Sequence, residues 1–203
     1  KIIFMKKFIL ASIVIGFFSC NNIDLPKPNV IIIYADDLGY GDVSSYGLGT
    51  LQTPNIDKIA NDGIRFTNGY ASSATCSPSR YALMTGTYPW RNKNAKILTG
   101  ANLIIDTTEM TLPKMFKSMG YQTGIVGKWH LGLGDGPVNH NEFISPGPNE
   151  VGFDHSFIMA HTQDRVPTVY IENGYVVDLD PNDPIEINFR GNDYGLPSGI
   201  KNP

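Results

Sequence analysis

Residues 111–128, TLPKMFKSMGYQTGIVGK, predict a helix followed directly by a short strand. Thr111 is a suitable N-cap and Pro113 suits the first helical turn, while Gly120 is a typical stop signal. Residues 123–126, TGIV, are a short stretch with three β-branched side chains, as expected of a strand. A helix that feeds a strand in this way is typical of an α/β fold.

The same alternation occurs upstream. Residues 30–34, VIIIY, form a continuous apolar run that predicts a central strand covered on both faces. Residues 53–63 predict a capped helix that ends at a glycine, residues 64–70 another strand, and residues 79–84 the opening of a further helix. We therefore expect an α/β fold, with helices packed on a mainly parallel sheet.

The chain beyond residue 131 is rich in glycine and proline, as loops around active sites often are. Within it, residues 166–170 and 175–179 predict an antiparallel hairpin across Glu172-Asn173-Gly174. No strand or helix signal closes the sequence before Pro203, so we expect the sheet to be incomplete at the C-terminus.

The composition is that of a globular chain. Of 203 residues, 41% are hydrophobic and 17% are charged. Sixteen Lys and Arg against nineteen Asp and Glu give a net charge of −3, and the basic residues form no run that could follow a nucleic-acid backbone. We therefore expect no nucleic-acid partner.

The first twenty residues predict an export signal. Lys6 and Lys7 precede an apolar stretch over residues 8–18, which is too short to span a bilayer. Ser19-Cys20 follows, and the segment resembles a bacterial lipoprotein signal in which Cys20 carries the lipid anchor. The alternatives are a cleaved signal without lipid and a buried N-terminal helix. We expect no disulfide between Cys20 and Cys76, the two cysteines of the chain.

Two adjacent carboxylates, Asp36 and Asp37, come at the end of the first predicted strand. Ligand sites of open α/β sheets lie at such strand ends. Neighbouring carboxylates repel each other unless a cation neutralises them, and oxygen ligands favour Ca²⁺ or Mg²⁺. The alternative is a solvated turn.

The segment Cys76-Ser77-Pro78-Ser79-Arg80 predicts a nucleophile at a helix N-terminus, where the helix dipole favours negative charge. Arg80, one turn further on, is suited to neutralise an anion there. A thiolate mechanism is the first interpretation from the residues alone. A buried structural cysteine is the alternative.

Lys128 and His130 follow the strand predicted at residues 123–126. If the backbone stays extended, the two side chains point to the same side. A cation beside an imidazole suits an anionic substrate and a proton-transfer step. An exposed lysine with a capped histidine is the alternative. Together, the three strand ends predict one polar crevice.

Three stretches then identify a family resemblance. Residues 76–80 match the sulfatase signature Cys-x-Pro-x-Arg, residues 120–132 are similar to the second signature, and residues 28–42 to the N-terminal metal strand. The chain resembles type I, formylglycine-dependent, arylsulfatase-like sulfatases of the alkaline phosphatase superfamily from residue 28 to at least residue 167. The resemblance implies an alkaline-phosphatase-like fold, with residues 1–20 a signal, 21–28 a linker and 29–203 the N-terminal part of the catalytic domain.

The resemblance also implies the chemistry. A maturation enzyme would convert Cys76 to formylglycine, whose hydrate attacks sulfur. Asp36, Asp37 and residue 76 would bind Ca²⁺, with Mg²⁺ as the alternative, and Arg80 would steady the hydrate. For the substrate, Lys128 and Thr162 would bind the sulfate and His130 would assist breakdown of the sulfated intermediate.

Further implications concern substrate and location. A sulfated glycan is preferred over an aryl sulfate, and His161, Asp164 and Arg165 either face the substrate or are surface polar residues. The protein would be exported, to the periplasm or the outer membrane. Because the family needs more metal ligands and leaving-group residues than these 203 residues supply, we expect the chain on its own to be inactive. The alternatives are a phosphate or phosphonate monoester hydrolase and an inactive glycan-binding surface lipoprotein.

Overall fold

The computed structural model describes residues 26–47, 51–95, 101–162, 165–187 and 200–201. The chain divides into two compact units, Lys1–Gln52 and Thr53–Pro203, and each is described by itself. The predicted signal at residues 1–20, with Cys20, lies outside the described residues. Among the described residues, the helices are all too short or too polar to cross a membrane.

The first unit contains an extended stretch and two 3₁₀ turns, η1 (Tyr40–Asp42) and η2 (Ser44–Tyr46). Residues 30–34 are extended, but within the described part of this unit they join no β-ladder, so the predicted central strand is wrong here. Ile31 and Ile33 are 84% and 83% exposed, whereas Val30 and Ile32 are 49% and 52% exposed. The exposure of the apolar run therefore alternates with the two-residue period of a strand, whereas strand pairing depends on a second segment.

The helices of the second unit are α2 (Pro54–Asp62), α3 (Cys76–Thr85), η3 (Pro89–Arg91), α4 (Leu112–Ser118) and α5 (Pro148–Val151). The predicted helices α2, α3 and α4 are confirmed, and α5 was not predicted. Their local signals act as expected, since Gly86 ends α3 with φ 66° and the Thr111 side chain accepts a hydrogen bond from the Lys114 backbone N–H.

The strand predicted at residues 64–70 is wrong. These residues form turns and irregular structure. Ile64, Phe66 and Tyr70 are 82%, 70% and 88% exposed. β-propensity expresses a fit to a half-buried pleated surface, so these apolar residues form a strand only where such a surface is provided.

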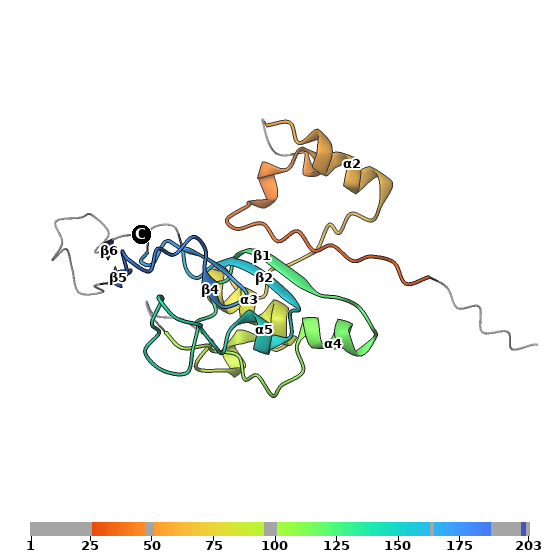
Figure 1. Cartoon of the computed structure of the whole chain (residues 1–203). Helices are drawn as coiled ribbons and strands as arrows, with labels where there is room; N and C mark the ends of the chain where they lie inside the picture. The colour runs from red at the N-terminus through yellow and green to blue at the C-terminus, as the bar shows by residue number, and fades with distance from the viewer. Residues whose placement is uncertain (1–25, 48–50, 96–100, 163–164, 188–199, 202–203) are drawn as a thin grey trace, which may run out of the picture. The chain divides into compact units, whose positions relative to one another are not determined.

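The main sheet of the second unit has the order β1 (Gly124–Lys128), β2 (His155–Met159), β3 (Tyr170–Glu172) and β4 (Tyr175–Val176). Figure 1 shows β1 and β2 side by side. β1 and β2 are parallel, while the other two pairs are antiparallel. The α/β class is confirmed, although the described sheet is mixed. A hairpin forms around Gly174 as predicted, but its first strand is β3 at residues 170–172 and not 166–170, and β4 is shorter than the predicted 175–179. The strand β2 was not predicted. A second, two-stranded sheet pairs β5 (Glu186–Ile187) with β6 (Ile200–Lys201).

One face of the main sheet carries the core. Ile158 and Ile171, cross-strand partners in β2 and β3, are buried together with Val151 of α5. Trp129 and Leu131, directly after β1, extend the same cluster. The core therefore surrounds the segment that leaves β1, and that segment is consequently fixed by packing.

A second segment holds the loop that follows β1. The backbone N–H of Leu103 donates to Gly134 O at 2.9 Å, and that of Ile104 donates to Leu131 O at 3.0 Å. Gly132 has φ 80°, and a Cβ added there would lie 1.9 Å from Asn102 O. Only glycine fits at position 132, where the loop after β1 passes the backbone of Asn102, because the left-handed backbone and the nearby carbonyl both exclude a side chain.

We predict that Gly132→Ala lowers the free energy of unfolding by about 2 kcal/mol or more, since strain at a left-handed position adds to the backbone clash. Gly136→Ala, in the same loop, is the matched control, because an added Cβ meets no described atom within 4 Å. Its effect should stay within about 0.5 kcal/mol. Urea unfolding measures both, and equal stability of the two variants would contradict this account of the crossing.

Candidate active site

Cys76 is the first residue of α3 and follows the N-cap Thr75. Its side chain is half-buried, and the Lys128 Nζ donates a hydrogen bond to Cys76 Sγ at 3.1 Å. Lys128 is the last residue of β1. The predicted nucleophile and the predicted sulfate-binding cation, 52 positions apart in the chain, are therefore in direct contact.

Arg80 lies one turn further along α3 and points toward the same strand end. Its Nη1 donates to the Lys128 backbone carbonyl at 2.6 Å. The guanidinium thus ties the start of α3 to the end of β1 and fixes the backbone from which the Lys128 side chain leaves. The predicted role of Arg80 in steadying the hydrate stays a prediction.

His130 follows β1 but not as an extended strand residue. Gly127 has φ 108° and His130 has φ 53°, so the backbone turns on both sides of Lys128. The alternation from which we predicted a common side for Lys128 and His130 is therefore absent. Instead, the backbone N–H of Trp129 donates to Met159 O at 2.9 Å, and the backbone N–H of His130 donates to Ala160 O at 3.0 Å.

These backbone bonds bring the ends of β1 and β2 together beyond the strands themselves. His161 and Thr162 follow Ala160, and the His130 and His161 ring centroids lie 6.4 Å apart with an interplanar angle of 87°. Both His130 ring nitrogens and Thr162 Oγ1 are buried, and the described residues offer them no hydrogen-bond partner. A polar ligand at this point would satisfy them.

The electrostatics of the site favour a negative charge. Burial first, and then the charges of Lys128, His161, Arg165 and Arg80, lower the pKa of His130 to about 4. Of these neighbours, Lys128, Arg165 and Arg80 are cations at pH 7. His130 is therefore neutral at pH 7, and an anion would find cations and unsatisfied polar groups together.

Two further histidines share this environment. Burial and then His161 lower the pKa of His140 to about 4, while burial and then Arg165 lower the pKa of His161. His161 is only 5% exposed, so the surface alternative weighed for it is wrong. His140 was not predicted, because a single histidine in a Gly- and Pro-rich loop carries no spacing signal.

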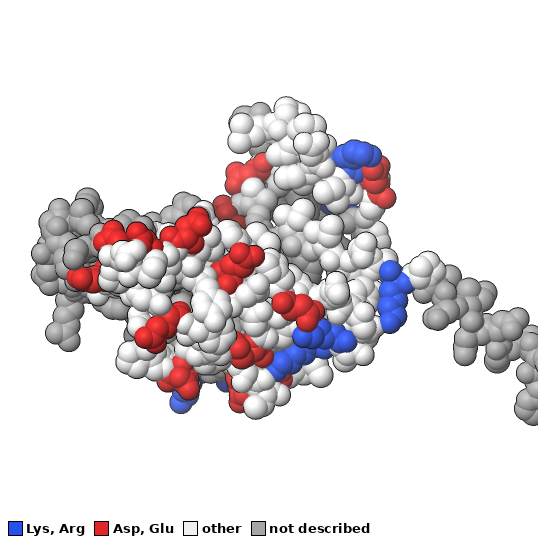
Figure 2. All heavy atoms as spheres, in the orientation of Figure 1, with Lys and Arg blue, Asp and Glu red and all other residues white. Residues whose placement is uncertain are grey.

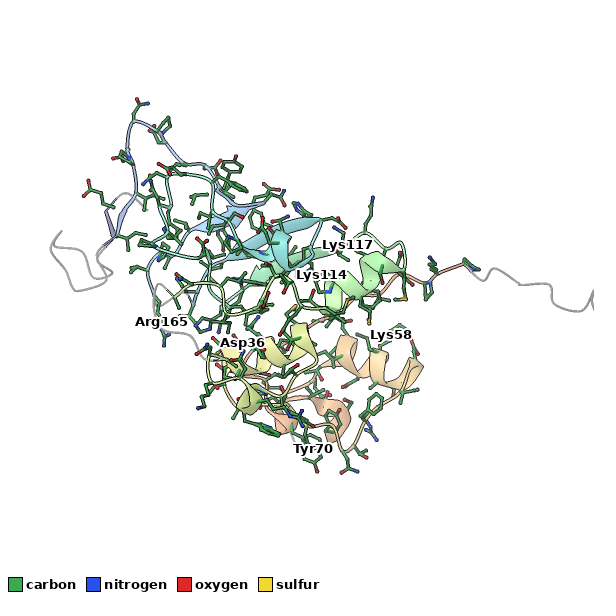
Figure 3. All side chains as sticks on the ribbon, turned by 90° about the horizontal axis from the view of Figure 1, so that it is seen from below. Asp36, Lys58, Tyr70, Lys114, Lys117 and Arg165 are labelled. Atoms are coloured by element: carbon green, nitrogen blue, oxygen red, sulfur yellow. The ribbon has the colours of Figure 1, made fainter. Side chains whose placement is uncertain are left out.

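The remaining loop residues are placed differently. Arg165 is exposed in the loop after β2, well away from Lys114 and Lys117 of α4 (Figure 3). Asp164 lies outside the described residues. On the face drawn in Figure 2, acidic side chains are spread in small groups, and basic side chains lie beside some of them. The cations that act on His130 are Lys128, Arg165 and Arg80.

Asp36 and Asp37 belong to the first unit and are exposed. Asp37 has φ 59°, which is uncommon for a residue other than glycine and often marks a functional position. Adjacent carboxylates suit a hard cation. However, the described residues contain no group of three or more His, Cys, Asp or Glu placed to hold a metal ion. The Ca²⁺ site stays a prediction.

A family model named Sulfatase matches residues 28–180. The chain belongs to the sulfatase family. It is 52% identical over 179 residues to an N-acetylgalactosamine-6-O-sulfatase of Bacteroides thetaiotaomicron, which covers 87% of this chain and 35% of that sulfatase. Human steryl-sulfatase is 43% identical over 114 residues, 53% of this chain and 20% of that protein.

Solved structures support the family fold. A chain from work on the metabolism of multiple glycosaminoglycans by Bacteroides thetaiotaomicron aligns with a TM-score of 0.77 and 54% identity, over 81% of this chain and 35% of that one. The structure of Ps i-CgsB aligns with a TM-score of 0.62 and 32% identity, over 74% and 37%. The alkaline-phosphatase-like fold is thereby confirmed, and this sulfatase-family chain spans about a third of the length of these relatives.

The buried histidines predict how stability depends on pH. Unfolded histidines titrate near 6.5, whereas the pKa values of folded His130 and His140 are about 4. In this window the unfolded state binds more protons, so the free energy of unfolding falls as the pH drops from about 6.5 to about 4, by up to about 1.4 kcal/mol per pH unit for each histidine.

Urea unfolding between pH 7 and pH 5 measures this slope. The double variant His130→Asn/His140→Asn should flatten it. A stability of the natural sequence that does not vary with pH in this range would contradict the burial of neutral imidazoles.

Proposed function

We propose that the protein hydrolyses sulfate esters of a sulfated glycan, with residue 76 converted to formylglycine. The contact between Lys128 Nζ and Cys76 Sγ is the observation that carries the proposal. It places a cation beside the predicted nucleophile, in surroundings that favour an anion. Sulfatases of this family generally use a formylglycine and a metal ion, so the matched family supports the same chemistry.

The substrate class follows from two relatives. One is an N-acetylgalactosamine-6-O-sulfatase, and one solved structure comes from work on glycosaminoglycan metabolism. Both are more than 50% identical to this chain. A sulfated amino sugar within a glycosaminoglycan is therefore the preferred substrate, ahead of an aryl sulfate.

The proposed reaction has two steps. A hydroxyl of the residue 76 hydrate attacks sulfur, the bond between sulfur and the glycan oxygen breaks, and the glycan alcohol leaves with a proton. The second hydroxyl then gives up its proton, the bond between the residue 76 carbon and the sulfate oxygen breaks, the aldehyde re-forms, and inorganic sulfate leaves. Water hydrates the aldehyde again.

The described side chains suit these steps. Lys128 neutralises sulfate oxygens, and Arg80 fixes the Lys128 backbone at 2.6 Å. His130, neutral because of burial and cationic neighbours, accepts the proton from the second hydroxyl. The negative charge of the bound sulfate offsets those cations and strengthens the imidazole as a base. Thr162 Oγ1, which has no partner among the described residues, donates to the sulfate.

We assign the proposed metal to Asp36, Asp37 and residue 76. When bound, Ca²⁺, with Mg²⁺ as the alternative, would supply positive charge that favours ionisation of the attacking hydroxyl. Two adjacent carboxylates are the hard oxygen ligands such an ion prefers. A maturation enzyme that recognises the Pro78 and Arg80 context is the partner that this chemistry requires.

We predict that residue 76 of the natural protein, co-expressed with a formylglycine-generating enzyme, is an aldehyde. The tryptic peptide should be about 18 Da lighter than the cysteine form. Cys76→Ala should abolish sulfate release from 6-sulfated N-acetylgalactosamine, because the nucleophile is lost. An unmodified thiol in fully active enzyme would refute the mechanism, while faster turnover of phosphate than of sulfate esters would favour the phosphate hydrolase alternative.

We also propose export, with a lipid anchor on Cys20 at the outer membrane or in the periplasm. The basic and apolar pattern of residues 6–20 supports this location. Labelled palmitate should be incorporated into the natural protein but not into Cys20→Ala. A full-length, unlabelled protein in the cytoplasmic fraction would contradict export, whereas a cleaved, unlabelled protein would indicate a simple signal.

A further inference from the structure

Two buried histidines lie beside each other at the ends of β1 and β2. His130 and His161 are each 5% exposed. Their rings meet nearly at a right angle, 87°, with centroids 6.4 Å apart. This is the edge-to-face arrangement that aromatic rings prefer at such a separation. The hydrogen bond from His130 N–H to Ala160 O, 3.0 Å long, holds the two backbones together next to the rings.

The His130 imidazole lacks the usual means of orientation. A histidine that transfers protons is commonly fixed by a hydrogen bond to its second ring nitrogen. Here both ring nitrogens are buried, and no partner for either occurs in the part of the chain that the structure describes. The ring must therefore be oriented by packing, and His161 is the aromatic ring packed against it.

We propose that His161 is a positioning residue, which holds the His130 ring in the orientation needed for proton transfer through edge-to-face packing. This inference rests on the sulfatase activity proposed above. It differs from the alternative in which His161 contacts the sugar, because the ring that lies against His161 is that of His130.

The charges around the pair fit this role. His130 faces Lys128, Arg165 and Arg80 as well as His161, while His161 faces Arg165 and His140. A positive charge on the His161 ring would be repelled by the neighbouring Arg165. Burial keeps His161 neutral at pH 7, so it supplies a ring surface rather than a charge.

Three substitutions separate ring packing from other roles, in natural protein with formylglycine at residue 76. His161→Phe keeps a flat ring, while His161→Leu fills much of the space without one and His161→Ala empties it. We expect His161→Phe to keep kcat within about threefold, and the Leu and Ala variants to lose about tenfold or more, because misorientation of a catalytic group lowers kcat. The KM should stay within about twofold in all three.

His155→Ala is the matched control, since this half-exposed histidine begins the same strand that His161 follows. It should keep both kcat and KM. A rise in KM at constant kcat in His161→Phe and His161→Ala would overturn the proposal in favour of a sugar contact. Unchanged kinetics in His161→Leu and His161→Ala would also overturn it.

A second measurement does not depend on turnover. The pKa of the His130 imidazole, followed by NMR, should rise in His161→Ala but stay close to that of the natural protein in His161→Phe, because only the emptied space lets water reach His130. A His130 pKa that stays unchanged in His161→Ala would overturn the positioning role. An inactive natural protein with formylglycine in place would count against the proposed function, while this NMR comparison would still decide the ring packing.

Discussion

The parallel pairing of β1 with β2, continued past both strands, is the constraint on which the candidate site depends. The ladder joins Gly124–Lys128 to His155–Met159 and continues through the bonds from Trp129 to Met159 and from His130 to Ala160. Parallel strands place their carboxyl ends at the same edge of a sheet. Lys128, His130 and Thr162 consequently leave the sheet close together although the chain connects them through a long loop.

The helix α3 is held to this edge by two polar contacts. Arg80 donates to the Lys128 carbonyl, and Lys128 donates to Cys76. A single strand residue is therefore bound through its backbone and its side chain to two residues of one helical turn. One helical turn separates the predicted nucleophile, Cys76, from Arg80, which fixes the backbone of the lysine that contacts Cys76.

The site combines cations with buried, neutral histidines. Burial of an imidazole disfavours its charged form, and nearby cations add to that effect. His130 is thus kept unprotonated at neutral pH, at the expense of stability in acid. In the proposed reaction, the negative charge of a bound sulfate would offset these cations, which would link substrate binding to the readiness of His130 to accept a proton.

The sequence by itself determined the helices α2, α3 and α4 and the presence of a hairpin around Gly174. Caps, first-turn prolines and glycine stops act within a few residues, so they can be found without knowledge of the rest of the chain. Family motifs likewise identified Cys76, Lys128 and Thr162 as site residues. The structure describes their surroundings, and their catalytic and binding roles stay predictions.

Only the tertiary structure decided which extended segments pair. Residues 30–34 and 64–70 look more like strands than residues 155–159, yet β2 forms because β1 and β3 hydrogen-bond to it on either side. Strand pairing joins distant segments, which local composition does not encode. For the same reason the burial of His161 and its packing against His130 had no sequence signal, since both follow from the register of β1 against β2.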